Sequence, residues 1–335
     1  MTIGTVVIGV GRVGQRRARV AHIHPGSRLV GVADLDGARA QAVAAELGCE
    51  WTTRWQDLVA RPDVQAVVVS TVNGALAAVT MGATAAGKHV LCEKPLGRSV
   101  SEAQHMVWSA ERARVILKTG LNHRYHPALW RAHQLASEGA IGELMWIRAC
   151  YGHGGRAGYE REWRANPTLS GGGELLDQGV HLVDLCRWFL GELEEASGWV
   201  ATCAWPMPVE DNAFALLRSA RGQVAMLHTS WTRWKNTFCF EVFGRQGYLV
   251  VEGLGGSYGA ERLTIGRRAP EGGPPSEEQV EFAGPDLSWE AEWEDFLAAI
   301  ANGHPPLGSG HDGLRAMRLL EAVYRSSAAG RVVRL

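Results

Sequence analysis

The feature that most constrains the fold is a short apolar run that leads directly into a glycine-rich turn. Val6–Ile8 suits a buried strand, and the following glycines are spaced G-x-G-x-x-G at the start of a helical pattern. Such glycines permit a tight turn and close approach to a pyrophosphate, while the helix N-terminus presents unpaired N–H groups and the positive end of its dipole. The pattern predicts a dinucleotide site at Gly9, Gly11, Arg12, Val13 and Gly14.

Strand and helix signals continue to alternate up to about residue 121. Apolar runs at 29–33, 66–69, 89–92 and 115–117 are the next expected strands. Continuous apolar strands separated by helices indicate a parallel, doubly wound Rossmann sheet of the α/β class, whose ligands bind beyond the carboxyl ends of the strands. The polar residues expected at those ends are Asp34, Ser70, Thr71, Asn73, Glu93, Lys94, Asn122 and His123.

Asp34 follows the second expected strand, about 20 residues after Gly14, which is the position of a ribose-binding acid in dinucleotide folds. A carboxylate there accepts hydrogen bonds from the ribose hydroxyls and repels a 2′-phosphate. NAD is therefore the expected cofactor, and NADP is disfavoured. The alternative is that Asp34, like Asp36, caps the helix that follows.

Lys94 precedes Pro95, and a residue before proline is held in an extended conformation. Its ammonium is therefore expected to project from a stiff backbone at the mouth of the sheet, as a catalytic cation would. The alternative is a surface lysine paired with Glu93, although adjacent residues on a strand point to opposite faces.

A second stretch with candidate catalytic side chains runs from Gly171 to Trp188. Apolar residues cover most of this expected helix, whereas Asp177, His181 and Asp184 follow the spacing i, i+4, i+7 and would share one α-helical stripe. The alternative is a core histidine whose ring is held by one of the two carboxylates.

Length and composition limit the remaining possibilities. The 335 residues suggest two domains, and a chain that is 46% hydrophobic and 21% charged, without a long apolar run, is expected to be globular and soluble. A net charge of −1 predicts no nucleic-acid or membrane partner. Six scattered cysteines without a C-x-x-C pair, and no signal-peptide pattern, predict no metal site and a cytoplasmic location.

These motifs together resemble the glucose-fructose oxidoreductase, inositol dehydrogenase and rhizopine-catabolism family, written Gfo/Idh/MocA. Glu93-Lys94-Pro95 combined with a Gly-Gly-x-Leu-x-Asp-x-Gly-x-His helix is specific to that family, and the match covers nearly the whole chain. The resemblance implies an NAD(P)-dependent oxidoreductase acting on a secondary alcohol of a sugar, sugar derivative or cyclitol. It also implies that Lys94, Asp177 and His181 are catalytic and that the Lys94–Pro95 peptide is cis.

The same resemblance assigns further positions. Segment 122–124 resembles one that faces the nicotinamide, and segment 162–164 resembles a loop over the cofactor. Where the family has Thr-Pro-Asn-x-x-His, this chain has Val72 and Leu76 in place of the proline and histidine. The resemblance therefore does not specify the shape of the pocket at this point. The expected cofactor side therefore comprises the glycine turn, Asp34, Ser70, Thr71, Asn73, Glu93 and Lys94, together with Asn122, Trp163 and Arg164 from segments 122–124 and 162–164. The substrate side includes Lys94, His123, His153, Trp163, Asp177 and His181.

After the expected Rossmann domain (1–121), the composition changes to that of an α+β domain (122–335) for substrate binding and oligomerisation. Short strands separated by glycine-containing turns predict a large, open, mostly antiparallel sheet. The expected strands are 144–150, 211–217, 223–231, 237–243 and 248–252. Because helices cover only one face of such a sheet, a twofold contact through the other predicts a homodimer or homotetramer. The last helix is expected to pack back on the first domain.

Alcohol oxidation requires removal of the hydroxyl proton as hydride leaves the carbon. His181 is the expected general base and Lys94 the group that stabilises the alkoxide, while Asp177 either holds a neighbouring substrate hydroxyl or tunes His181. Two other functions stay open: an NAD-dependent glycosidase that oxidises its sugar transiently, and a sensor that binds a dinucleotide or sugar without turnover.

Overall fold

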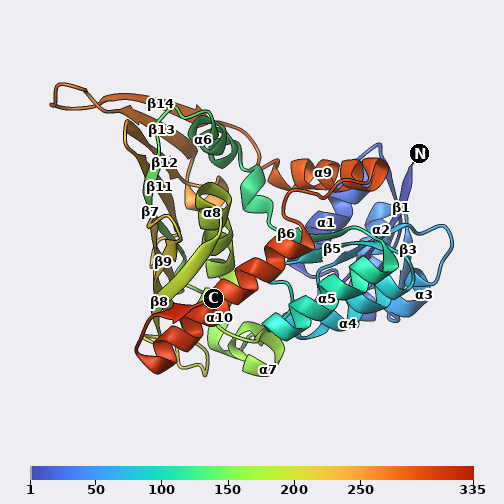
Figure 1. The fold of residues 1–335 in the computed structure, drawn as a ribbon. Helices are drawn as coiled ribbons and strands as arrows, with labels where there is room; N and C mark the ends of the chain where they lie inside the picture. The colour runs from blue at the N-terminus through green and yellow to red at the C-terminus, as the bar shows by residue number, and fades with distance from the viewer. Residues whose placement is uncertain (1) are drawn as a thin grey trace. The chain divides into compact units, whose positions relative to one another are not determined.

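The computed structural model describes residues 2–335, which divide into two compact units (Figure 1). The first contains the described residues up to Leu121, Thr168–Gly171 and Trp289–Met317, and the second contains Asn122–Pro167, Gly172–Ser288 and Arg318–Leu335. The first unit thus extends beyond the expected range 1–121 by two later segments.

The first unit is built on a six-stranded parallel sheet in the order β3-β2-β1-β4-β5-β6, which confirms the doubly wound α/β prediction. Its strands are β1 (Ile3–Ile8), β2 (Ser27–Ala33), β3 (Glu50–Thr52), β4 (Ala66–Val69), β5 (His89–Glu93) and β6 (Leu117–Gly120). The last strand begins later than expected because the Val115 N–H bonds the Ala110 carbonyl and closes the preceding helix.

Helices cover both faces of this sheet. They are α1 (Arg12–Ile23), α2 (Gly37–Leu47), α3 (Trp55–Val59), α4 (Asn73–Ala85), α5 (Val100–Ala113) and α9 (Ser288–Asn302). The short α7 (Pro167–Ser170) also contributes residues to the first unit. Figure 1 shows α4 and α5 together on one face, whereas α1, α2 and α9 contribute to the core on the other. Helix α10 (Gly310–Ala329) supplies residues to both units.

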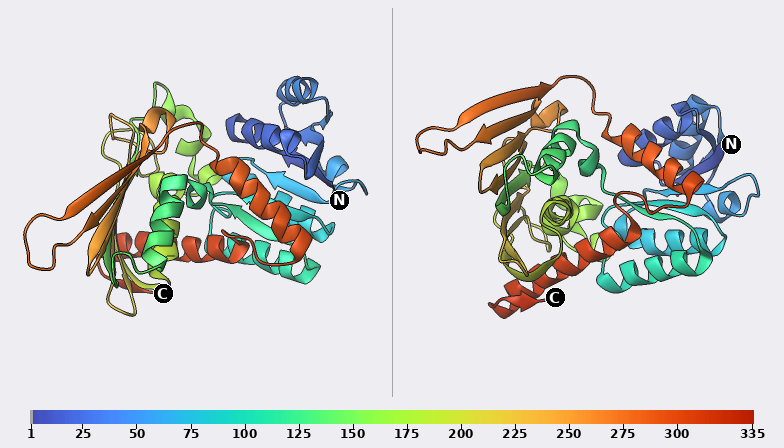
Figure 2. Two further views of the ribbon diagram at one scale, coloured as in Figure 1. Left: turned by 90° about the horizontal axis from the view of Figure 1, so that it is seen from above. Right: turned by 45° about the horizontal axis from the view of Figure 1, so that its top comes forward.

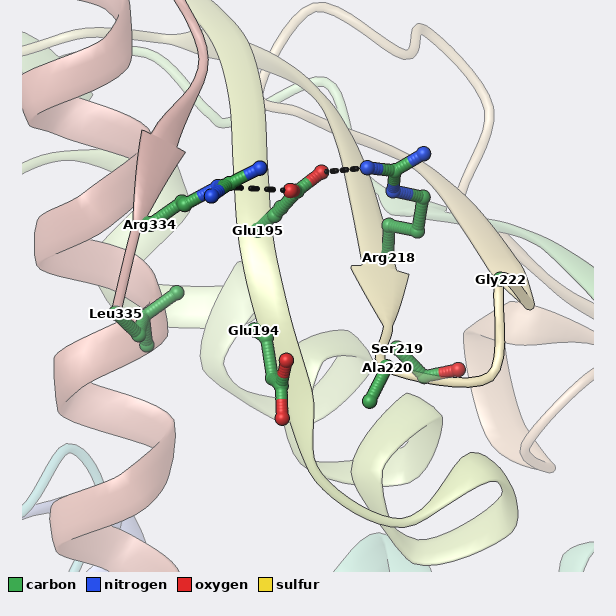
Figure 3. A pocket seen from close by; sticks show the side chains of 8 residues that line it. All are labelled: Glu194, Glu195, Arg218, Ser219, Ala220, Gly222, Arg334 and Leu335. Carbon is green, nitrogen blue, oxygen red and sulfur yellow. Dashed lines mark hydrogen bonds and ion pairs between the residues drawn. The ribbon is translucent and has the colours of Figure 1, made fainter.

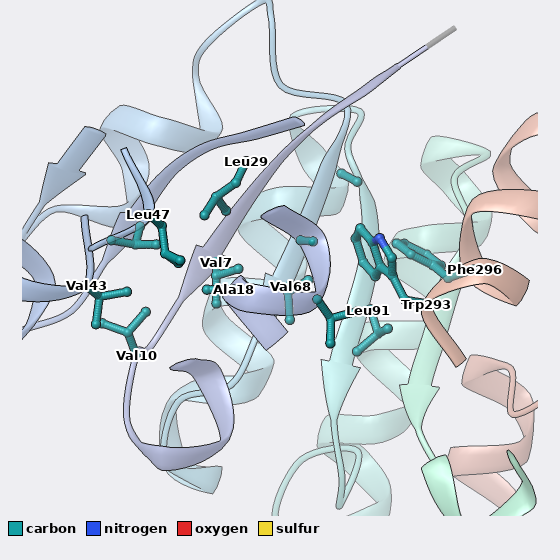
Figure 4. Packing of buried hydrophobic residues seen from close by; sticks show 14 of the residues in the cluster. Val7, Val10, Ala18, Leu29, Val43, Leu47, Val68, Leu91, Trp293 and Phe296 are labelled. Atoms are coloured by element: carbon teal, nitrogen blue, oxygen red, sulfur yellow. The ribbon is translucent and has the colours of Figure 1, made fainter. Parts of the chain in front are cut away.

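The core of the first unit joins segments from opposite ends of the chain (Figure 4). Val7 and Val68 from the sheet lie in the same buried cluster as Trp293 and Phe296 of α9. The indole of Trp293 also donates a hydrogen bond to Ser27 Oγ over 3.0 Å. Burial of one such large apolar side chain contributes about 1.5–3 kcal/mol, so α9 is an integral part of this unit.

The second unit contains a nine-stranded sheet in the order β14-β13-β12-β11-β7-β10-β9-β8-β15. Its strands are β7 (Leu144–Gly152), β8 (Leu193–Ala201), β9 (Asn212–Ser219), β10 (Val224–Ser230), β11 (Thr237–Gly244), β12 (Gly247–Glu252), β13 (Glu261–Arg267), β14 (Ser276–Phe282) and β15 (Val333–Arg334). The pairing is mostly antiparallel as predicted, but β7 and β10 pair in parallel because the chain forms β8 and β9 before it returns beside β7.

Helices α6 (Pro127–Ser137) and α8 (Val180–Leu190) lie on the same side of this sheet (Figure 2). Helix α6 begins with Pro127, whose fixed φ suits the first helical position, and is followed by Gly139 at φ 77°. In the part of the chain that the structure describes, every helix is too short or too polar to traverse a lipid bilayer.

Candidate functional site

The glycine turn between β1 and α1 leaves room for a ligand at one glycine and not at the other two. Gly9 has φ 86°, and a Cβ there would lie 2.7 Å from the Ser70 carbonyl oxygen. A Cβ on Gly14 would overlap the Gly9 carbonyl, whereas a Cβ on Gly11 would meet nothing within 4 Å. The turn therefore packs tightly on β4 and stays open at the N-terminus of α1, which suits a pyrophosphate.

Asp34 is tied to the glycine turn and does not cap the next helix. Its Oδ2 accepts the Val10 N–H over 2.9 Å, and its Oδ1 accepts the Asp36 N–H over 3.0 Å. Asp36 caps α2 by accepting the Arg39 N–H, and the Arg39 guanidinium lies 3.4 Å from Asp34 Oδ2. The capping alternative thus belongs to Asp36, and Asp34 stands beside the predicted ribose position.

The two departures from the family pattern change side chains without changing the chain path. Val72 has φ −60° and ψ 151°, which a proline would also adopt. Leu76 is fully buried in the core. Asn73, the first residue of α4, is also buried, and its Nδ2 donates to the Ser170 carbonyl over 2.8 Å. The Asn73 amide nitrogen therefore already has a protein acceptor.

Lys94 follows the last residue of β5, and the Lys94–Pro95 peptide is cis, as the resemblance implied. The preceding Glu93 is buried. Its Oε1 accepts a hydrogen bond from Arg17 Nε over 2.8 Å, and its Oε2 lies 3.3 Å from the Lys94 N–H. The Glu93 carboxylate thus faces Arg17 and the Lys94 backbone.

In the second unit, the stretch that carries Asp177 and His181 is not a continuous α-helix. Leu175–Gly179 (η4) is π-helical, and α8 begins only at Val180. A π-helical turn contains an extra residue, so the expectation of one α-helical stripe through Asp177 and His181 is wrong.

A buried carboxylate holds the start of this π-helical turn. Glu210 Oε2 accepts the Gly173 N–H over 3.0 Å, and its Oε1 accepts the Leu175 N–H over 3.1 Å and the Tyr324 hydroxyl over 2.6 Å. Burial raises the pKa of Glu210, although these hydrogen bonds act in the opposite direction. A Cβ on Gly173 would overlap the Glu210 backbone, so this glycine is required by close packing. Sequence reasoning missed Glu210, which lies far along the chain in no recognisable motif.

Asp177 forms an ion pair within the second unit. Arg164 Nε donates to Asp177 Oδ2 over 3.0 Å, and the Arg164 guanidinium lies 4.6 Å from the centre of the Trp163 ring. The charge of Asp177 is the main cause of the raised pKa of Arg164. The loop that sequence reasoning assigned to the cofactor side is thus joined to a residue assigned to catalysis.

His181 is buried and stacked on His123, with ring centroids 3.7 Å apart. Asn122 Oδ1 lies 3.3 Å from His123 Nδ1. Asp184 pairs with Arg124, at 2.6 and 2.8 Å.

His153 lies close enough to Asp177 for their charges to interact. Burial lowers the pKa of His153, and the Asp177 carboxylate acts in the opposite direction. The His153 ring also contacts Tyr159 edge to face, with centroids 5.7 Å apart. The Asp177 carboxylate is thus the centre of a group in the second unit that also contains His153, Trp163 and Arg164.

The predicted site residues therefore form one group in each unit. The first unit holds Gly9, Gly11, Arg12, Val13, Gly14, Asp34, Ser70, Thr71, Asn73, Glu93 and Lys94. The second holds Asn122, His123, His153, Trp163, Arg164, Asp177 and His181. Among residues 2–335, no three His, Cys, Asp or Glu side chains are grouped so as to hold a metal ion.

A pocket at the edge of the nine-stranded sheet contains none of these residues (Figure 3). Its lining includes Glu195, which pairs with Arg218 over 2.5 Å and with Arg334 over 3.1 Å. Its charged groups largely satisfy one another, so this pocket offers no comparable chemistry.

Comparisons with known proteins match both units. Residues 3–121 match a family model described as "Oxidoreductase family, NAD-binding Rossmann fold", and residues 129–250 match "GFO/IDH/MocA C-terminal domain". A 1,5-anhydro-D-fructose reductase from Ensifer adhaerens is 31% identical, with 92% of each chain covered. An inositol 2-dehydrogenase from Rhizobium meliloti (strain 1021) is 27% identical over 99% of each chain. The crystal structure of GenD2 from gentamicin A biosynthesis, in complex with NAD, has a TM-score of 0.87 at 27% identity and covers 100% of this chain and 96% of that one.

Proposed function

This chain belongs to the Gfo/Idh/MocA family of NAD-binding oxidoreductases, and we propose that it transfers hydride between a secondary alcohol of a sugar, sugar derivative or cyclitol and the nicotinamide. The 1,5-anhydro-D-fructose reductase and the inositol 2-dehydrogenase support this substrate class. The observation that carries the proposal is the set of Asp177, His181 and Lys94 in a chain that also has an open glycine turn beside Asp34.

The residues of the first unit fit a dinucleotide. The space at Gly11 and the N-terminus of α1 would hold the pyrophosphate, and Asp34 would accept the ribose hydroxyls. When bound, NAD supplies the hydride acceptor for alcohol oxidation. Because Asp34 repels a 2′-phosphate, NADP is the less favoured cofactor.

We assign His181 as the general base that removes the hydroxyl proton and returns it in the reverse direction. The Lys94 ammonium stabilises the developing alkoxide. Asp177 holds a neighbouring substrate hydroxyl, and its ion pair with Arg164 orients the carboxylate for this purpose. His123, His153 and Trp163 complete the substrate side of the site.

The deciding experiment follows NADH absorbance and sugar products together over a panel of sugars, glycosides and inositols, with NAD and NADP. A dehydrogenase forms NADH and a keto product in equal amounts. A redox-neutral glycosidase, which the relatives do not favour, releases an aglycone with no net NADH. Dinucleotide binding without turnover of any substrate in the panel would support the sensor alternative and contradict this proposal.

We also propose that the chain forms a homodimer or homotetramer through the face of the nine-stranded sheet opposite α6 and α8. Trp199 is directly opposite Phe214 on the neighbouring strand, and Leu216 is directly opposite Met226. Directly opposed residues project from the same face, so these four form one apolar patch. Trp199 is 62% exposed and the other three are 44–45% exposed, which favours a protein contact over solvent.

Analytical ultracentrifugation tests the oligomer. Phe214→Glu should shift the wild-type dimer or tetramer to a smaller species, whereas Trp51→Glu, at an exposed tryptophan of the first unit, should leave the assembly unchanged. A monomeric wild-type protein would overturn the proposal.

The six free thiols favour a reducing, cytoplasmic location.

A further inference from the structure

A fully buried guanidinium connects three elements of the first unit behind the strand end that carries Lys94. Arg17, on α1, has a side chain that is only 1% exposed. Its NH2 group lies 2.6 Å from Glu93 Oε1, and its NH1 group lies 2.6 Å from Glu292 Oε2 of α9. One cation thus joins the glycine-turn helix, the end of β5 and a helix close to the C-terminus.

The Glu93 carboxylate carries this connection to Lys94. One oxygen is held by two guanidinium nitrogens of Arg17, and the other faces the Lys94 N–H at 3.3 Å. The buried, charge-assisted hydrogen bond from Arg17 Nε to Glu93 Oε1 restricts the movement of this carboxylate. The position of the Lys94 backbone therefore depends on the position of Arg17.

Neighbouring groups leave Arg17 little freedom of its own. The Trp289 ring of α9 lies 4.4 Å from the guanidinium carbon. On β6, a Cβ at Gly120 would come within 3.0 Å of the Arg17 NH2 group and 3.1 Å of the Glu93 carboxyl carbon. Ring, helix and strand thus confine the guanidinium.

Stability alone does not account for so many buried charges. Burial raises the pKa of Glu292, although the charge of Arg17 acts in the opposite direction. Apolar side chains of similar volume often replace buried ion pairs with no loss of stability. A role in orienting a neighbouring side chain explains this cluster of buried charges more specifically.

We infer that Arg17 and Glu292 are positioning residues for Lys94, which act through the Glu93 carboxylate to fix the direction in which the lysine leaves β5. The inference rests on the proposed role of Lys94 in hydride transfer. It assigns to α9, about 200 residues later in the sequence, a part in aligning a catalytic group of the N-terminal sheet.

The test compares two matched substitutions in α9. Glu292→Gln removes the charge that holds Arg17, whereas Asp295→Asn removes the charge beside Lys118, a second buried cation that is 3.2 Å from Asp295. We expect Glu292→Gln and Arg17→Lys to lower kcat about 10- to 100-fold at nearly unchanged KM for NAD. Asp295→Asn should keep the wild-type kcat, even if its midpoint of thermal unfolding falls by as much as that of Glu292→Gln.

A second measurement does not require turnover. The acylation rate of Lys94, followed by mass spectrometry with the exposed Lys235 as internal reference, should change in Arg17→Lys and stay at the wild-type value in Asp295→Asn. Wild-type kcat and wild-type Lys94 acylation in Arg17→Lys would overturn the inference. If the wild-type enzyme turns over no substrate but Lys94 acylation still changes in Arg17→Lys, the proposed function fails and the positioning role stands.

Discussion

The imidazole rings of His123 and His181 lie in parallel contact, with centroids 3.7 Å apart and planes inclined by 22°. Since both rings are buried, His123 limits the orientations that His181 can adopt. His123→Ala should lower kcat about ten-fold and destabilise the protein by about 1–3 kcal/mol, because it leaves a cavity beside the base. His123→Phe retains a planar ring and should restore most of the activity. Steady-state kinetics and thermal unfolding of both variants check this, and equal activity losses would contradict a packing role.

Lys94 and His181 should be required for chemistry and not for cofactor binding. We expect Lys94→Ala and His181→Ala each to lower kcat by about 10²- to 10⁴-fold, the usual contribution of a positioned acid, base or charge. NADH binding, measured by its fluorescence, should change little. Lys235→Ala, at an exposed lysine, serves as the matched control. Near-normal turnover in either active-site variant would refute the assigned roles.

Asp34 should determine the choice between NAD and NADP. Asp34→Ser removes the charge that repels a 2′-phosphate and frees Arg39, which lies 3.4 Å from that carboxylate, to bind it. The ratio of kcat/KM for NADP to that for NAD should rise about 100-fold. Asp36→Ser, at the capping position two residues later, should leave this ratio unchanged. A rise of similar size in both variants would show that Asp34 has no special role.

Cys150 lies on the same face of the nine-stranded sheet as Phe214, and in the dissociated Phe214→Glu variant it should react with alkylating agents at neutral pH. It lies directly opposite Cys239 on the neighbouring strand. A hydrogen bond from the Cys239 thiol, assisted by Arg233 and Arg148, lowers the pKa of Cys150 to about 7 against the effect of burial. Because the thiolate is the reactive form, labelling by iodoacetamide should accelerate with rising pH, reach half its maximal rate near pH 7 and level off about one to two pH units higher.

Cys239→Ser supplies the control for this thiol, because a serine hydroxyl is a different hydrogen-bond partner. Labelling of Cys150 at pH 7 should slow in this variant, while the exposed Cys203 should react as in the wild type. Peptide mass spectrometry separates the two sites. An unchanged pH profile in Cys239→Ser would contradict the influence of the paired thiol.

Much of the first unit could be predicted from the sequence because its strands are buried on both faces and therefore read as continuous apolar runs. The strands of the second sheet were harder to predict. Strand β14 consists largely of exposed polar residues, and its identity comes from pairing with β13 and not from its own apolar content. The parallel pairing of β7 with β10 likewise depends on which distant strands meet.

The candidate site shows the same contrast between local sequence patterns and contacts between distant segments. Motif spacing identified Asp34 and Lys94, but only the hydrogen bonds of Asp36 show which aspartate is the helix cap. The π-helical turn before His181 depends on Glu210, which is more than 30 residues later, and helical periodicity contains no sign of it. Contacts between distant segments thus decide the details that local patterns leave open.

The inclusion of α9 in the first unit affects the order in which the chain can fold during synthesis on the ribosome. Trp293 and Phe296 complete the core around Val7 and Val68, and Glu292 completes the partners of Arg17. The nascent N-terminal segment therefore lacks part of its core until nearly the whole polypeptide has emerged from the exit tunnel. A ribosome stalled before residue 289 would hold a Rossmann sheet with an uncovered apolar surface, which is the kind of surface that chaperones bind.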